Sequence, residues 1–228
     1  MLLLYKIAPF GNNDTVKGGE DMQARYGVRT LTLLTVMLSL YLILWQVFSA
    51  FLDLPVYYYG RLIELLGLGL FAALAAVTPM KFEDMGILVP RKTLFRSLSL
   101  GLGVGLLFVC LLWGARQMLG INTPISWYIG GDISRATYIV AAPLQEILSK
   151  SVMLYSFELV FEGRHPRLAT LLSALVFGAF HVVYGIKLML LAALLTLVTG
   201  AMFHRDRCVW GCAVAHFACG FLPGCFGF

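Results

Sequence analysis

Charged residues are scarce in this chain. Lys, Arg, Asp and Glu make up 13% of its 228 residues, whereas hydrophobic residues make up 60%. A soluble domain carries about 25% charged residues, so the composition excludes an ordinary soluble globular protein. Together with a mean hydropathy of +0.84, it predicts an integral membrane protein in contact with the lipid bilayer.

Several other signatures are also lacking. No charged segment followed by a short apolar stretch and a cleavage site stands near Met1, so no cleavable signal peptide is expected. The five cysteines show no CxxC spacing and are expected to be small apolar residues at helix contacts. No basic stripe or RNA-binding motif accompanies the net charge of +5, so nucleic-acid binding is not expected.

Long apolar runs are what the chain does have. A membrane-spanning helix needs about 20 mostly apolar residues. Seven runs approach that length, at 28–51, 58–78, 98–114, 136–159, 168–185, 188–203 and 209–222. Lipid offers no partner for backbone N–H and C=O groups, so these runs are expected to be helices. The predicted fold is therefore all-α, a polytopic membrane bundle of about seven transmembrane helices, with an N-terminal arm at 1–27 and a single transmembrane domain at 28–228.

Positive residues lie mostly on one side of this topology. Of the 17 Lys and Arg residues, Lys150 lies inside a run, twelve fall on the side of the N-terminus, and the other side holds only Arg61, Arg116, Arg135 and Lys187. Positive residues accumulate on the cytoplasmic side of membrane proteins. We therefore expect a cytoplasmic N-terminus and arm, and a C-terminus on the outer side.

The fourth run contains a polar cluster. Its sequence PLQEILSK places Gln145, Glu146, Ser149 and Lys150 among apolar residues. An uncompensated charge in hydrocarbon costs at least ~2.5 to 3.5 kcal/mol on insertion scales, so such a residue is a functional-site candidate. Positions four apart share a helix face, so Glu146 and Lys150 can also form a purely structural ion pair. Arg61 and Glu64 in the second run are expected to form a simpler interfacial pair.

Two histidines are expected to reach a similar depth in the bundle. At a rise of 1.5 Å per residue, Gln145 lies about 24 Å, His181 about 21 Å and His216 about 14 Å from the cytoplasmic ends of their helices. A carboxylate that activates water, with imidazoles to position the water or polarise a carbonyl, can hydrolyse a peptide bond. Glu146, His181 and His216 would equally suit a zinc site, and the two histidines alone could hold a haem as a minor alternative.

Three segments carry a resemblance to a known family. AAPLQEILSKS, SALVFGAFH and AVAHFACG resemble the ordered motifs EExxxR, FxxxH and HxxxN or HxxxD of the CAAX protease and bacteriocin-processing (CPBP) family of intramembrane endopeptidases, over about residues 135–220. Phe177 and His181 match the second motif, and His216 matches the third. The resemblance implies cleavage of a membrane-associated protein or peptide substrate, with catalytic Glu146 as base, His181 positioning water and His216 at the oxyanion.

The departures from the family pattern bear on activity. Gln145 stands where the family has its first Glu, Lys150 replaces Arg, and Gly220 replaces the Asn or Asp that assists His216 at the oxyanion. Gln cannot act as a general base, and Gly has no side-chain donor. Two function classes therefore stay open: an intramembrane endopeptidase, and a catalytically inactive relative that serves as a scaffold for a membrane protein partner.

Overall fold

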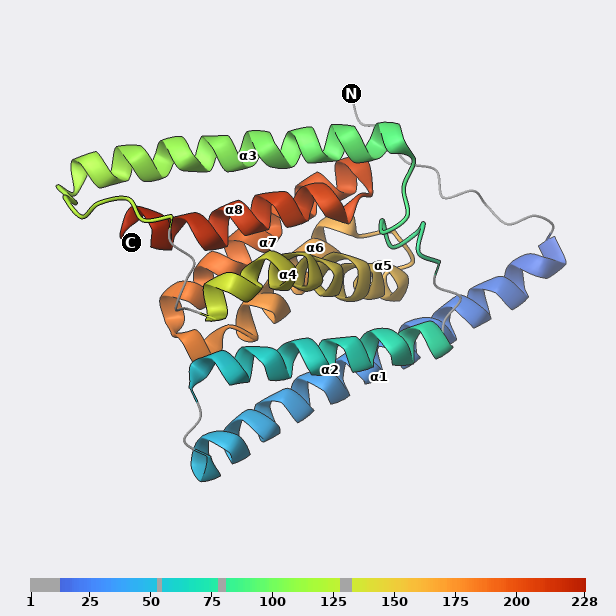
Figure 1. Cartoon of the computed structure of the whole chain (residues 1–228). Coiled ribbons are helices and arrows are strands. Elements are labelled where there is room, and N and C mark those ends of the chain that lie inside the picture. Colours follow the sequence, from blue (N-terminus) through green and yellow to red (C-terminus); the bar gives the residue numbers. More distant parts are fainter. Residues whose placement is uncertain (1–12, 53–54, 78–80, 128–132) are drawn as a thin grey trace.

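The computed structural model describes residues 13–52, 55–77, 81–127 and 133–228. All regular structure in these ranges is helical (Figure 1). This confirms the predicted all-α class. The elements are α1 (Asn13–Phe51), α2 (Val56–Val77), α3 (Arg91–Met118), α4 (Ile133–Glu146), a π-helical segment (Ile147–Leu154), α5 (Tyr155–Val160), α6 (Pro166–Ala179), a 3₁₀ turn (Val182–Tyr184), α7 (Ile186–Asp206) and α8 (Val209–Phe226).

Four described helices are long and apolar enough to cross a membrane. They are the Tyr26–Phe51 part of α1, and α3, α7 and α8. The outer faces of α1, α3 and α7 carry large exposed apolar side chains. On α3, for example, Leu106, Leu107 and Leu111 are 67%, 61% and 61% exposed. Such a surface is stable in lipid and not in water, so the chain is an integral membrane protein. The count of seven spans stays a prediction.

Two predicted boundaries differ from the structure. Helix α1 begins at Asn13, so the second half of the predicted arm is helical and continuous with the first span, and residues 1–12 lie outside the described ranges. The run at 168–185 was predicted as one helix. In the structure, α6 ends at Ala179, and a 3₁₀ turn at Val182–Tyr184 leads to Gly185. Gly185 has a φ of +90°, which favours glycine and breaks the helix before α7 begins. His181 therefore lies in a connection and not within a helix.

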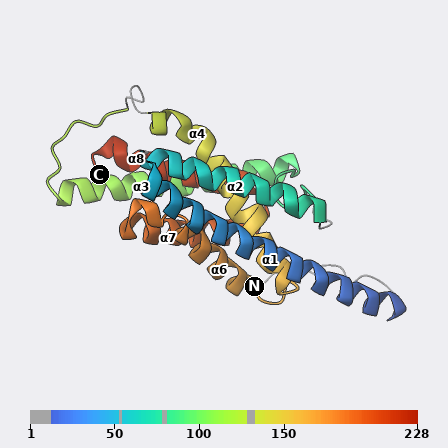
Figure 2. The same cartoon turned by 90° about the horizontal axis from the view of Figure 1, so that it is seen from below.

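The bundle is layered around α8. Helix α8 packs against α3 on one side and against α4 and α7 on the other, and α1 and α2 close the opposite side of the molecule. Figure 2 shows α1 and α2 running side by side across the bundle. The α3–α8 crossing is close because it is lined by glycines: a Cβ on Gly211 would overlap the carbonyl oxygen of Ser97, and one on Gly101 would come within 3.0 Å of the Gly211 carbonyl carbon.

Ion pairs and backbone contacts join helix ends that the predicted topology places on the same side. At the end with most of the positive residues, Arg207 donates to both carboxylate oxygens of Glu158, at 2.8 and 2.7 Å. At the other end, Arg116 donates to the carbonyl oxygen of Phe226 at 2.6 Å. Each contact joins ends that the predicted topology places on one side of the membrane, and the orientation of the termini stays a prediction.

Candidate functional site

The polar cluster lies where α4 passes into the π-helical segment. Glu146 is the last residue of α4, three positions after Pro143, which cannot donate a backbone hydrogen bond and interrupts the helical ladder. The segment that follows has the wide turn of a π-helix, which turns its side chains away from the directions of a regular α-helix. Glu146, Ser149 and Lys150 are all 0% exposed.

The Glu146 carboxylate joins three helical segments. Its Oε2 lies 3.2 Å from Nζ of Lys150, so the predicted ion pair between these two residues is present. Its Oε1 lies 2.8 Å from Nδ1 of His216 on α8 and 3.5 Å from Oγ1 of Thr199 on α7. Because a carboxylate only accepts, Nδ1 of His216 carries the proton and donates it. Glu146 thus holds the His216 ring in place and leaves its Nε2 for other partners.

His181 is oriented in a similar way. Its Nδ1 lies 2.8 Å from the carbonyl oxygen of Phe177, which can only accept, so Nδ1 carries the proton and Nε2 keeps an acceptor lone pair. The Phe177 ring centroid lies 4.8 Å from that of His181 and 6.0 Å from that of His216. The residues of the second and third motifs are therefore side by side, with both imidazoles against one phenyl ring.

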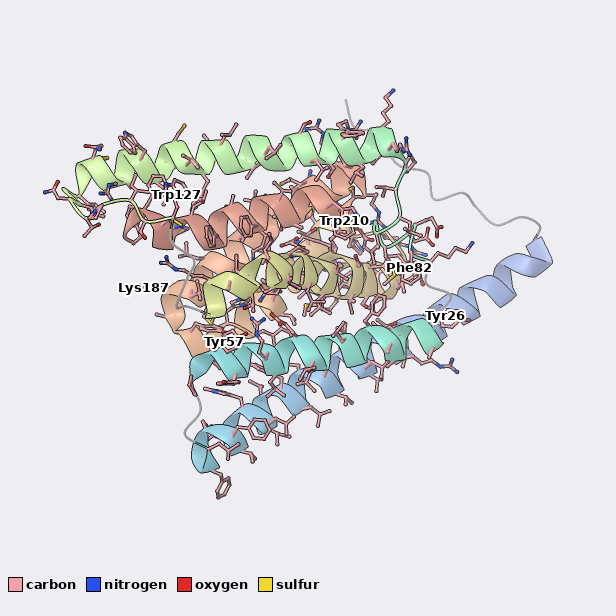
Figure 3. The ribbon with its side chains drawn as sticks, viewed as in Figure 1. Tyr26, Tyr57, Phe82, Trp127, Lys187 and Trp210 are labelled. Atoms are coloured by element: carbon pink, nitrogen blue, oxygen red, sulfur yellow. The ribbon has the colours of Figure 1, made fainter. Side chains whose placement is uncertain are left out.

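Gln145 faces a different helix. Its Nε2 donates to Oε1 of Glu64 on α2 at 3.2 Å, and Oε2 of Glu64 accepts from Arg61 at 2.8 Å. The predicted Arg61–Glu64 pair is confirmed. Glu64 is only 7% exposed, however, and it also contacts Gln145, so the pair is not a simple interfacial one. Tyr57, labelled at the start of α2 in Figure 3, lies beside Thr137 of α4 at 3.4 Å between hydroxyls. Helix α2 therefore supplies a carboxylate next to Gln145 that sequence reasoning had not linked to the site.

Gly220 lies one turn after His216 on α8, and its empty side-chain position is filled from α4. A Cβ on Gly220 would overlap the hydroxyl oxygen of Tyr138 and come within 2.5 Å of its Cζ. The Tyr138 ring centroid lies 6.1 Å from that of His216. Tyr138 was not among the predicted site residues, because nothing in its local sequence distinguishes it from an ordinary apolar-run tyrosine.

Comparison with known families bears directly on the segment that carries this geometry. Residues 133–222 match the family model described as Type II CAAX prenyl endopeptidase Rce1-like. The segment is similar to that family, and we refer to it as the Rce1-like segment. The match begins at α4, ends within α8 and covers less than half of the chain, and it confirms the resemblance to the CAAX protease family. Comparisons with curated proteins and with solved structures gave no match.

The geometry of the motif residues bears on the metal and haem alternatives. In the part of the chain that the structure describes, no group of three or more His, Cys, Asp or Glu side chains is arranged to hold a metal ion. Oε1 of Glu146 is bonded to Nδ1 of His216, so zinc could bind these two residues through Oε2 and Nε2. The zinc site stays a prediction. A haem between the two imidazoles would have to displace Phe177, which contacts both rings.

One motif histidine of the Rce1-like segment, His216, contacts the Glu146 carboxylate, and the other, His181, packs against the same Phe177 ring as His216. A buried imidazole that is bonded to a carboxylate is held in one orientation. A second imidazole with an acceptor nitrogen can take a proton from water. The arrangement can therefore supply a proton acceptor and an oriented imidazole within a low-dielectric interior.

Proposed function

We propose that this protein is an intramembrane endopeptidase that hydrolyses a peptide bond in a membrane-associated protein or peptide. The observation that carries this proposal is the 2.8 Å contact between the buried residues Glu146 and His216, with the Phe177 ring packed against both His216 and His181. A purely structural Glu146–Lys150 pair would not require a histidine from α8 at the same carboxylate. The match to a CAAX prenyl endopeptidase family supports the same chemistry.

The two histidines divide the work of hydrolysis. Nε2 of His181 accepts a proton from water as the water oxygen bonds to the scissile carbonyl carbon. The resulting oxyanion accepts a hydrogen bond from Nε2 of protonated His216, whose charge is stabilised by Glu146. When the C–N bond breaks, His181 returns the proton to the leaving nitrogen, so that the products are a carboxylic acid and an amine.

This scheme gives Glu146 a positioning role in place of the general-base role that the motif comparison implied. Oε1 is bonded to His216 and Oε2 lies 3.2 Å from Lys150, and the side chain is 0% exposed. A fully buried carboxylate beside an ammonium group is a poor acceptor for a proton from water. Its hydrogen bond to Nδ1 fixes the orientation of the His216 ring.

The proposed substrate class is a prenylated protein with a C-terminal CAAX sequence, taken from the description of the matched family. A lipid-anchored substrate reaches an intramembrane site by moving within the bilayer, and the apolar outer faces of the helices provide the lipid contact. We also propose that the N-terminus faces the cytoplasm, because twelve of the 17 Lys and Arg residues lie on its side of the predicted topology.

The test is cleavage of an internally quenched, farnesylated CAAX peptide by the full chain in liposomes, with products identified by mass spectrometry. We expect His181→Ala and His216→Ala to lower the rate at least ~100-fold, because each removes a group that acts in the transition state. His165→Ala is the matched control, since His165 is exposed at the start of α6. Cleavage that persists in His181→Ala, or that is lost equally in His165→Ala, would contradict the proposal.

One observation favours the scaffold alternative. Gln145 is bonded to Glu64 on α2 and presents an amide where the family has a water-activating carboxylate. A scaffold predicts that wild-type protein cleaves no peptide, and that His181→Ala retains a co-purifying membrane partner to the same extent as wild type. Cleavage by wild type would exclude it.

A further inference from the structure

The hydroxyl of Tyr138 occupies the space beside His216 that a side chain at position 220 would otherwise fill. Positions four apart on a helix are neighbours, so a side chain at 220 would lie next to His216. A Cβ there would overlap the Tyr138 hydroxyl and come within 2.5 Å of Cζ. Glycine at 220 is therefore the residue that lets the phenol approach α8.

Two aromatic contacts hold the phenol in this position. The Tyr138 ring lies 6.1 Å from the His216 ring and 6.0 Å from the Phe217 ring, both on α8. Helices α4 and α8 lie against each other along this stretch (Figure 1). The hydroxyl is thus held on the same side of His216 as the family's third-motif Asn or Asp would be, but it comes from another helix.

We propose that Tyr138 donates the second hydrogen bond to the oxyanion, in place of the side chain that Gly220 lacks; this inference rests on the proposed endopeptidase function. A phenol has one O–H donor and can serve beside Nε2 of His216. Two donors aimed at the developing charge stabilise the transition state more than one. The hydrogen bond transfers no proton, so the balance of the reaction is unchanged. Tyr138 is then a catalytic residue supplied from α4.

The test is steady-state cleavage of the farnesylated peptide by Tyr138→Phe, which keeps the ring and its packing and removes only the hydroxyl. We expect kcat to fall by about 10²- to 10³-fold, the loss typical of an oxyanion donor, with KM within about twofold of wild type. Tyr155→Phe is the matched control, because Tyr155 is also partly buried but lies on α5. An unchanged kcat in Tyr138→Phe, with wild type active, would overturn this inference and leave the proposed function standing.

A residue swap supplies a second variant. Gly220→Asn alone should lose activity, because its side chain would collide with the Tyr138 hydroxyl. Tyr138→Ala together with Gly220→Asn makes room for the amide, and we expect it to be at least about tenfold faster than Tyr138→Ala alone, since one donor replaces another. A double variant no faster than Tyr138→Ala would count against a donor role.

A binding measurement keeps the inference testable without turnover. The probe is the same farnesylated peptide with the scissile amide replaced by a phosphinate, which mimics the tetrahedral anion. We expect wild type to bind the phosphinate at least about 100-fold more tightly than the amide peptide, and Tyr138→Phe to lose most of that preference. Wild type that neither cleaves the amide nor prefers the phosphinate would overturn both this inference and the proposed function.

Discussion

Neutralising Glu146 is expected to destabilise the protein strongly, because it strands a buried cation. Both side chains of the Glu146–Lys150 pair are 0% exposed, and the charged atoms lie 3.2 Å apart. At that distance and an effective dielectric constant of about 20, the attraction amounts to about 5 kcal/mol. Breaking a buried pair by removing one partner typically costs about 3 to 5 kcal/mol. We expect Glu146→Gln to lower the free energy of unfolding by about that amount.

Removing both charges should restore much of the loss. In Glu146→Gln combined with Lys150→Met, the apolar Met side chain fills most of the volume of the lysine and leaves no unpaired charge. Replacing a buried ion pair by apolar groups is often neutral or stabilising. We therefore expect the double variant to be more stable than Glu146→Gln alone by at least about 2 kcal/mol.

The assay is equilibrium unfolding of the purified protein in bicelles, followed by tryptophan fluorescence. Glu162→Gln is the control, because the Glu162–Arg164 pair is 2.6 Å long but its side chains are 36% and 72% exposed. An exposed pair contributes about 0 to 1 kcal/mol. If Glu146→Gln and the double variant were equally destabilised, Lys150 would not depend on Glu146 and the buried-pair argument would be refuted.

Three further outcomes follow from the packing and the donor geometry. Gly211→Ala should lower the free energy of unfolding by about 1 to 3 kcal/mol, because the added Cβ would overlap the Ser97 carbonyl oxygen. Gly103→Ala is the control in the same unfolding assay and should be neutral, because a Cβ at position 103 has no neighbouring atom within 4 Å. Gln145→Glu should lower the thermal unfolding midpoint, because it places a second carboxylate 3.2 Å from that of Glu64. Adding Glu64→Gln should restore the midpoint. If the single and the double variant unfolded at the same temperature, residues 64 and 145 would not be in contact. A chelator should leave peptide cleavage unchanged, because the proposed scheme uses the two imidazoles of His181 and His216 and no metal ion; lost cleavage that zinc restores would contradict this.

The membrane class, the helical fold and two ion pairs followed from the sequence alone, because each depends on short-range information. The length of an apolar run and the need to satisfy backbone hydrogen bonds in lipid require a helix regardless of neighbouring segments. The Glu146–Lys150 and Arg61–Glu64 pairs were predictable since spacings of four and three residues place side chains on one helix face. The motif order then identified the Rce1-like segment.

The tertiary structure decided which helix each polar side chain meets. Gln145 and Glu146 are adjacent in the chain, yet one is bonded to Glu64 on α2 and the other to His216 on α8. Spacing along a helix sets the angle between two side chains but not the identity of the helices around them. That identity comes from packing, here from glycines that allow a close α3–α8 crossing and from Gly220, which admits the Tyr138 hydroxyl from α4. Glu146 and His216 are 70 residues apart in the chain, so their contact depends on how the whole bundle packs. Which residues make up the site was therefore visible only in the tertiary structure.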